Sequence, residues 1–395
     1  MMFWSGVTYS ILVMGLWSFH QTSLFQPWLP PVLWLVPYPQ AHGFMMVYGV
    51  LGFYFCGFLL TTFPRWLDQP EVARSEYILI WFLLSLGAHL FWVGLFAGSE
   101  LSAAGVFLFL GGLAVAVRRM GLILLASTSA NRYQQVMILF GLTSGLVGLS
   151  LYGAGITLAD PVLISTVRPM GVYLFLLPVV LGVIHRMVPF FTSTVTPNYE
   201  VRRWAPALLI YALLLSIRSG LELRGLSQWS MLSDLPMALV LGIELAMWRF
   251  WRADRRPLLL VLYMAMAWLW LSFLVSGLES VVMVFRELPV RPFGHAAMHM
   301  MTVGGLGTLL LGISTRVTLG HSGQGLATDR LTALLFYLFQ LVPLMRIAPE
   351  IAGYWIPTIK MHSFWSGWGW VLVFGVWFLA FGRVLTQPRS DGRPG

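Results

Sequence analysis

Charged side chains are scarce in this sequence of 395 residues, since Asp, Glu, Lys and Arg together make up only 10% of it. A soluble domain carries roughly a quarter of such residues, so the composition excludes an ordinary soluble protein. Apolar residues account for 58%, and the mean hydropathy is +0.79, which predicts an integral membrane protein. The net charge of +9 comes mainly from arginines that punctuate apolar runs. This arrangement favours loops facing an anionic lipid surface over nucleic-acid binding.

Cysteine and lysine are almost absent. The single cysteine, Cys56, excludes an intramolecular disulfide and any metal cage or iron–sulfur cluster built from cysteines. The single lysine, Lys360, argues against Schiff-base chemistry inside the membrane. The sequence also contains no Gly-rich phosphate loop ending in Lys-Ser/Thr, no GxSxG nucleophile elbow and no HExxH zinc motif.

Long apolar runs recur along the whole chain, and about 20 such residues suffice to cross a bilayer. They predict an all-α bundle of about twelve transmembrane helices in a single domain, residues 1–395. The Pro- and Trp-rich stretch 24–39 is expected to be a loop at the membrane surface, and the first run a retained helix. The predicted helices are 3–19, 42–63, 76–97, 100–120, 135–158, 163–188, 204–223, 230–250, 258–285, 294–316, 330–348 and 363–384.

The distribution of basic residues predicts the orientation of the chain. Of the 24 Lys and Arg residues, 17 fall in the loops on one side of the predicted bundle, Arg389 and Arg393 among them. This bias places that side, and both chain termini, in the cytoplasm. The remaining basic residues are Arg168, Arg218, Arg224, Arg286, Arg291, Arg346 and Lys360.

Six of the eight histidines fall on the opposite, outer side of the predicted bundle: His20, His42, His89, His295, His299 and His362. Polar ring nitrogens in an apolar chain are costly unless they are hydrogen-bonded or bound to metal. His185 and His321 are placed at cytoplasmic helix ends instead.

His42 and His299 are the leading ligand candidates, because two histidines from different helices at similar depth could hold one heme iron. His295 precedes His299 by four residues and shares its helix face. Glycines follow on both helices, including Gly49 and Gly304, and suit either tight helix packing or a flat macrocycle against the backbone. Against this reading, a lone histidine near a helix end is most often an interfacial residue, the interpretation given to His20 and His362.

His89 and several charged residues complete the candidate set. His89, deep in the third predicted helix, could belong to a second site with His295. Heme propionates would need cations on the outer side, a role open to Arg218, Arg286 and Arg291. Glu279 could pair with Arg286, accept a hydrogen bond from a ligand histidine, or carry protons. Glu244, near a cytoplasmic helix end, is expected to pair with Arg249 or Arg252.

Three segments resemble the NnrS family, in the right order along the chain. The first is His42-Gly-Phe-Met-Met-Val-Tyr-Gly49, continuing to Gly57-Phe-Leu-Leu-Thr-Thr-Phe-Pro-Arg-Trp66. The second is His185-Arg-Met-Val-Pro-Phe-Phe-Thr192. The third is Met298-His-Met-Met-Thr-Val-Gly-Gly-Leu-Gly307, ending in Thr315-Arg-Val-Thr-Leu-Gly-His-Ser-Gly323.

The resemblance implies a heme- and copper-containing protein of the bacterial inner membrane, linked to nitric oxide and denitrification. On that basis His42, His299 and His321 match family histidines. The sequence departs from the family pattern at Phe44, where a second histidine often stands, and at His185, where glycine is usual. The His42 segment is also distantly similar to the low-spin heme helix of heme–copper oxidases, but the paired catalytic histidines of those enzymes are missing.

The first hypothesis is therefore a membrane hemoprotein that binds or reduces nitric oxide, with one or two b-type hemes and possible copper. Ligands would come from His42, His299, His295 and His89, and Glu279 is the candidate proton carrier. Electrons would come from quinol or a periplasmic donor. The alternatives are a quinol-linked heme electron-transfer protein and a non-redox small-molecule transporter, which broken apolar helices also fit.

Overall fold

A computed structural model of the protein describes residues 1–323, 325, 328–356 and 362–387. These residues form helices and loops without strands, and twelve helices are long and apolar enough to cross a membrane. The predicted number of spans is thus confirmed, and the chain is a multi-pass membrane protein. Three basic residues used above to predict orientation, Lys360, Arg389 and Arg393, lie outside the described residues. The cytoplasmic location of the termini stays a prediction.

The chain divides into two compact units, and α1 (Met2–Ser23) contributes to both. Unit 1 comprises Met1–Val13, Trp28–Ile184 and Leu208–Leu223; unit 2 comprises Met14–Pro27, His185–Ala207 and Arg224–Gly395. Up to Leu223, the further elements are α2 (Tyr38–Phe44), η1 (Met45–Val50), α3 (Leu51–Trp66), α4 (Arg74–Ala97), α5 (Ser99–Ala126), α6 (Tyr133–Leu158), α7 (Pro161–Ser165), η2 (Pro169–Leu176), α8 (Leu177–Val195) and α9 (Pro206–Leu223).

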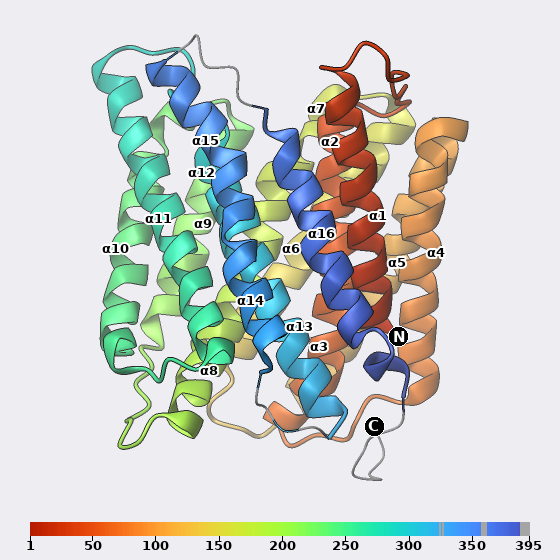
Figure 1. The fold of residues 1–395 in the computed structure, drawn as a ribbon. Coiled ribbons are helices and arrows are strands. Elements are labelled where there is room, and N and C mark those ends of the chain that lie inside the picture. The colour runs from red at the N-terminus through yellow and green to blue at the C-terminus, as the bar shows by residue number, and fades with distance from the viewer. Residues whose placement is uncertain (324, 326–327, 357–361, 388–395) are drawn as a thin grey trace. The chain divides into compact units, whose positions relative to one another are not determined.

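The elements after Leu223 all belong to unit 2. They are η3 (Ser227–Trp229), α10 (Met231–Met247), η4 (Phe250–Arg252), α11 (Pro257–Phe285), α12 (Ala296–His299), η5 (Met300–Gly307), α13 (Thr308–His321), α14 (Arg330–Phe339), α15 (Leu341–Trp355), α16 (Phe364–Phe381) and η6 (Val384–Thr386). Within this unit α11 packs against α10, η5 and α13, and α15 packs against α16 (Figure 1). Within unit 1, α4 and α5 form a hairpin and α6 packs against α5 and η2.

The spans agree with the predicted ranges within a few residues, except where a helix continues past the predicted end. The sixth span runs to Val195 rather than 188, and the eleventh to Trp355 rather than 348. Pro189 lies inside the sixth span and Pro349 inside the eleventh, each directly after the predicted end. A helix that continues keeps most backbone groups hydrogen-bonded inside the membrane, which outweighs the cost of one proline.

Three spans contain a π-helical segment, and these same spans are the most buried. In the most apolar part of each span, 72% of the residues are buried in the second span, 89% in the sixth and 72% in the tenth. The buried share is at most 56% in the other spans. Each π-helical segment, η1, η2 or η5, lies in the first half of its span. Regular π-helical turns are rare and occur frequently at functional sites. Two of these segments, η1 and η5, closely follow the predicted ligands His42 and His299.

Neighbouring side chains occupy the space beside Gly49 in the second span and Gly304 in the tenth. A Cβ on Gly304 would lie 2.7 Å from Cδ2 of Trp268, and a Cβ on Gly49 would lie 2.6 Å from Cε1 of Tyr9. Of the two interpretations that the sequence left open, the structure therefore supports tight helix packing at these positions.

A Gly304→Ala substitution is expected to destabilise the protein by about 1–3 kcal/mol, because the rigid indole of Trp268 must move to admit the methyl group. The midpoint temperature of unfolding in detergent micelles measures the effect. Gly375→Ala on α16 is the matched control, since a Cβ there meets nothing within 4 Å. Equal destabilisation of the two variants would contradict this account of Gly304.

Candidate functional site

The predicted ligand histidines are divided between the two units. His42 and His89 belong to unit 1, whereas His295 and His299 belong to unit 2. Each pair is therefore described within its own unit, and the prediction that His42 and His299 share one iron stays a prediction.

His299 is the last residue of α12, directly before the π-helical segment η5. Its Nδ1 lies 2.9 Å from the carbonyl oxygen of His295. Because a carbonyl only accepts hydrogen bonds, Nδ1 must carry the proton, and Nε2 of the neutral ring then presents its lone pair. Metal-binding histidines are commonly oriented in this way by a carbonyl.

The packing of α12 leaves its histidines on a different face from its buried residues. Ala296 and Met300 are buried in a cluster with Ile347 of α15, against which Trp268 of α11 also packs. His295 is exposed, His299 is half-buried, and their ring centroids are 6.4 Å apart with planes inclined at 71°. The predicted shared face of the two histidines is thus present in unit 2.

His42 lies in α2, three residues before the π-helical segment η1. The helix begins at Tyr38 rather than at His42 as predicted, because Pro37 and the proline at position 39 fit a helix N-terminus. His42 therefore sits one turn inside the span, and its side chain is half-buried.

His89 lies on α4 of unit 1 with an exposed ring. Its Nδ1 donates to the carbonyl oxygen of Ser85 at 2.7 Å, and its ring centroid is 5.6 Å from that of Tyr9. The tautomer is the same as that of His299. His362 lies among aromatic rings, 4.5 Å from the centroid of Phe25, as expected of an interfacial residue.

The surroundings of Phe44 do not suit copper. Phe44 is fully buried, its ring centroid lies 4.1 Å from that of Phe91, and it stacks on Tyr152 at 5.6 Å. These rings provide no imidazole or thiolate donor at the position where the family often has a second histidine. In the part of the chain that the structure describes, no three His, Cys, Asp or Glu side chains form a metal-binding group. A heme iron needs only one or two axial ligands from the protein, so the histidines above still suit it.

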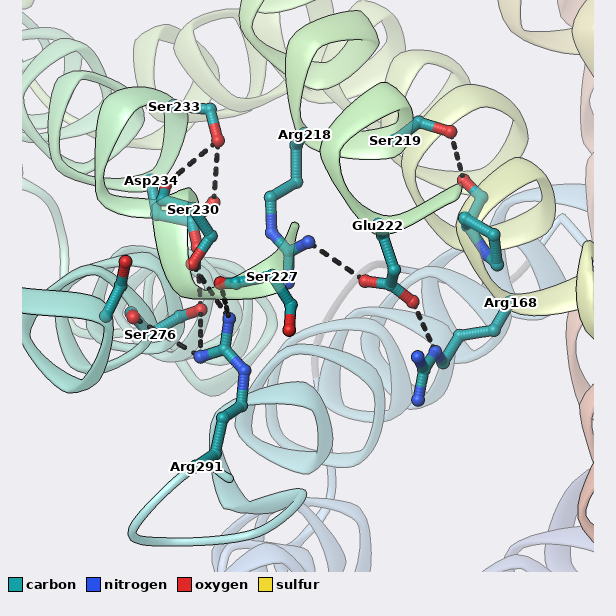
Figure 2. A network of polar contacts seen from close by, with 12 residues as sticks. Arg168, Arg218, Ser219, Glu222, Ser227, Ser230, Ser233, Asp234, Ser276 and Arg291 are labelled. Atoms are coloured by element: carbon teal, nitrogen blue, oxygen red, sulfur yellow. Dashed lines mark hydrogen bonds and ion pairs between the residues drawn. The ribbon is translucent and has the colours of Figure 1, made fainter. Parts of the chain in front are cut away.

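In unit 1, a cluster of charged side chains lies at the start of the sixth span and the end of the seventh (Figure 2). Glu222 accepts from Nη1 of Arg218 at 2.9 Å and from Nε of Arg168. The guanidinium of Arg218 lies over the ring of Tyr173, 4.5 Å from its centroid. The side chains of Arg218 and Glu222 are only 4% and 8% exposed, so this is a buried ion pair with a second arginine at its edge.

In unit 2, Arg291 is held by a set of serines that also surround Asp234 (Figure 2). Arg291 donates to Oγ of Ser230 at 2.8 Å and to Oγ of Ser276 at 3.1 Å. Ser276 in turn donates to Oδ2 of Asp234 at 2.6 Å, and Asp234 is buried. The sequence did not single out Asp234, although an acid at the start of an apolar run was a visible signal.

Glu279 lies beside these serines, and its arginine partner is Arg291 rather than Arg286. Its Oε1 accepts from the backbone N–H of Phe293 at 2.7 Å, and its Oε2 lies 3.6 Å from Nη1 of Arg291. Arg286 stands exposed at the end of α11. Arg218 and Arg291 are thus engaged by acidic or serine side chains, whereas Arg286 presents its cation at the surface.

At the opposite, arginine-rich end of unit 2, Glu244 has a partner that the sequence did not suggest. Its Oε1 lies 3.3 Å from Nε2 of His185, and both side chains are at most 2% exposed. The expected partners Arg249 and Arg252 follow the end of α10 at Met247. His185 and Glu244 are far apart in the chain, so charge patterning along one helix could not have paired them.

The family model described as NnrS protein matches residues 1–389. A search of the curated proteins finds no match.

Proposed function

The chain belongs to the NnrS family, and from this premise we propose that it is a membrane hemoprotein that binds or reduces nitric oxide. A b-type heme would lie at the outer side of a bacterial inner membrane and would be held by His42 and His299. His295 and His89 remain candidates for a second site. The chain lies in a lipid bilayer, and quinol or a periplasmic protein would supply electrons.

The observation that carries the proposal is the orientation of His299. The hydrogen bond from Nδ1 to the His295 carbonyl fixes the ring and directs the lone pair to Nε2. The adjoining π-helical segment η5 supports the same assignment, because such segments concentrate at functional sites. His42 precedes η1 in the corresponding way.

When bound, a heme would supply an iron that takes a diatomic ligand and exchanges electrons. The protein would contribute axial ligation, exclusion of water and a cation for the propionates. Arg286 suits the last role because its guanidinium is exposed, while Arg218 and Arg291 would act through buried networks. Glu279, buried and hydrogen-bonded by Phe293 through Oε1, could hold a proton at Oε2.

An absorption spectrum of the purified protein, with heme and metal quantified per chain, tests the proposal. We expect a Soret band that sharpens on reduction with dithionite and shifts when nitric oxide is added. No copper is expected at the Phe44 position. A protein without a Soret band would overturn the proposal and favour a transporter. A heme spectrum that is indifferent to nitric oxide would favour quinol-linked electron transfer instead.

A further inference from the structure

The arginine-rich end of unit 2 contains buried protonatable groups that the proposed heme chemistry does not use. His185 and Thr192 stand seven residues apart on α8, which places them on one helix face about 10 Å apart along its axis. Both are fully buried. Glu244 of α10 and Tyr263 of α11 meet this face at its two ends.

His185 and Glu244 together suit the binding of one exchangeable proton. Nε2 of His185 lies 3.2 Å from the carbonyl oxygen of Trp204, so it carries a hydrogen, and 3.3 Å from Oε1 of Glu244. With one added proton the pair is neutral overall, as imidazole and carboxylic acid or as imidazolium and carboxylate. Without that proton the pair leaves a net negative charge in a buried place, which is costly.

Further along the same face of α8, a chain of hydroxyl groups begins at Thr192. Tyr263 and Thr192 are hydrogen-bonded at 2.9 Å between Oη and Oγ1. Tyr199, in the loop after α8, is hydrogen-bonded to Tyr263 and donates to the carbonyl oxygen of Trp248 at 3.0 Å. Burial raises the pKa of Tyr199, which keeps it a neutral phenol. Hydroxyls both donate and accept, so they can pass a proton along.

The other charged groups around the cluster include two arginines and two acids: Glu200 directly follows Tyr199, and the backbone N–H of Asp254 donates to Oγ1 of Thr196 in the same loop. Arg203, just before α9, donates through Nη2 to the carbonyl oxygen of Arg186 at 3.1 Å and acts electrostatically on His185. Arg316 of α13 lies over the ring of Phe191, 3.5 Å from its centroid. These cations favour a negative charge on the pair and so ease release of its proton after loading.

We propose that His185 and Glu244 form a proton-binding site that is loaded from the arginine-rich side through Tyr199, Tyr263 and Thr192, with water carrying the proton over the roughly 10 Å between Thr192 and His185. The binding site itself does not depend on heme. Its use does rest on the proposed function: an electron added to a buried iron attracts a compensating proton, and this site would take it up. The site then couples heme reduction to proton uptake from that side.

Infrared difference spectroscopy of the full-length protein after a pH jump tests proton binding directly. We expect a carboxyl signal that shifts in D2O and is lost in Glu244→Gln, while Glu71→Gln, at an exposed ion pair, retains it. Tyr263→Phe keeps the ring and removes the hydroxyl, and should slow the appearance of the signal by about 100-fold. An unchanged signal in Glu244→Gln would overturn the proposal. If that variant does not fold, an unchanged rate in Tyr263→Phe overturns the loading route, and no wild-type carboxyl signal overturns the site.

A redox titration separates this proposal from the function on which its use rests. In the heme-loaded protein, the midpoint potential should fall with rising pH, and the dependence should disappear in Glu244→Gln and return in Glu244→Asp. If the pair had only a structural role, the pH dependence of the midpoint potential would remain in Glu244→Gln. That result would contradict the coupling of heme reduction to proton uptake. A protein without heme would fail the proposed function, while the infrared signal would still report on the proton site.

Discussion

Replacing His299 by alanine is expected to abolish the heme spectrum of the purified protein. The substitution removes Nε2. The hydrogen bond from Nδ1 to the His295 carbonyl leaves Nε2 as the ring nitrogen whose lone pair can bind the iron. Loss of an axial ligand leaves an iron with weakened attachment, so most of the Soret absorption should disappear during purification. The measurement is the ratio of Soret to protein absorbance, with heme extracted and quantified per chain. His42→Ala is expected to act in the same direction.

The histidines at the two ends of the tenth span, His295 just before it and His321 at its last residue, are the controls for His299. His321→Ala changes the far end of the tenth span and should leave the heme content unchanged. His295→Ala keeps the backbone carbonyl that orients His299, so any loss of heme there reports a second site rather than the first. A normal reduced spectrum in both His299→Ala and His42→Ala would refute the ligand assignment.

Glu222→Ala is expected to destabilise the protein by about 3–5 kcal/mol, because it leaves the buried guanidinium of Arg218 without its carboxylate. Arg168 would lose the same partner. The midpoint temperature of unfolding in detergent micelles, followed by near-ultraviolet circular dichroism, measures the effect. Adding Arg218→Met should restore much of the loss, since an apolar side chain of similar length then fills the site.

The matched control is Glu71→Ala, which breaks the exposed pair with Arg65. The side chains of Arg65 and Glu71 are 65% and 78% exposed, so the expected cost is about 0–1 kcal/mol. Equal destabilisation by Glu222→Ala and Glu71→Ala would contradict the assignment of Arg218 and Glu222 as a buried ion pair.

The twelve spans were predictable because the bilayer imposes one length and one composition on every crossing. The π-helical segments were not predictable. The same apolar sequence is compatible with backbone hydrogen bonds to the residue four positions back or to the residue five positions back. His42 illustrates the difference: its presence at the outer side was predictable, but its place one turn inside the span depends on where α2 begins.

The candidate site was predictable in its residue types and only partly in its contacts. His295 and His299 follow from helical spacing, and the structure contains the pair. Glu279 and Arg291 are brought together by the fold of the loop between α11 and α12, so the nearer-looking Arg286 was the wrong partner. The pairing of His185 with Glu244 depends on helix packing between distant segments, for which sequence spacing carries no signal.

The π-helical segment η5 has a consequence for the register of the tenth span. A turn that closes five residues back contains one residue more than an α-helical turn, so everything before it is rotated by about 100° relative to an uninterrupted helix. Removing one residue from Met300–Gly307 would therefore swing His299 to another face, while Arg316 and His321 kept theirs. The π-helical segment thus allows His299 to face a different direction around the helix axis without changing how the rest of the span packs.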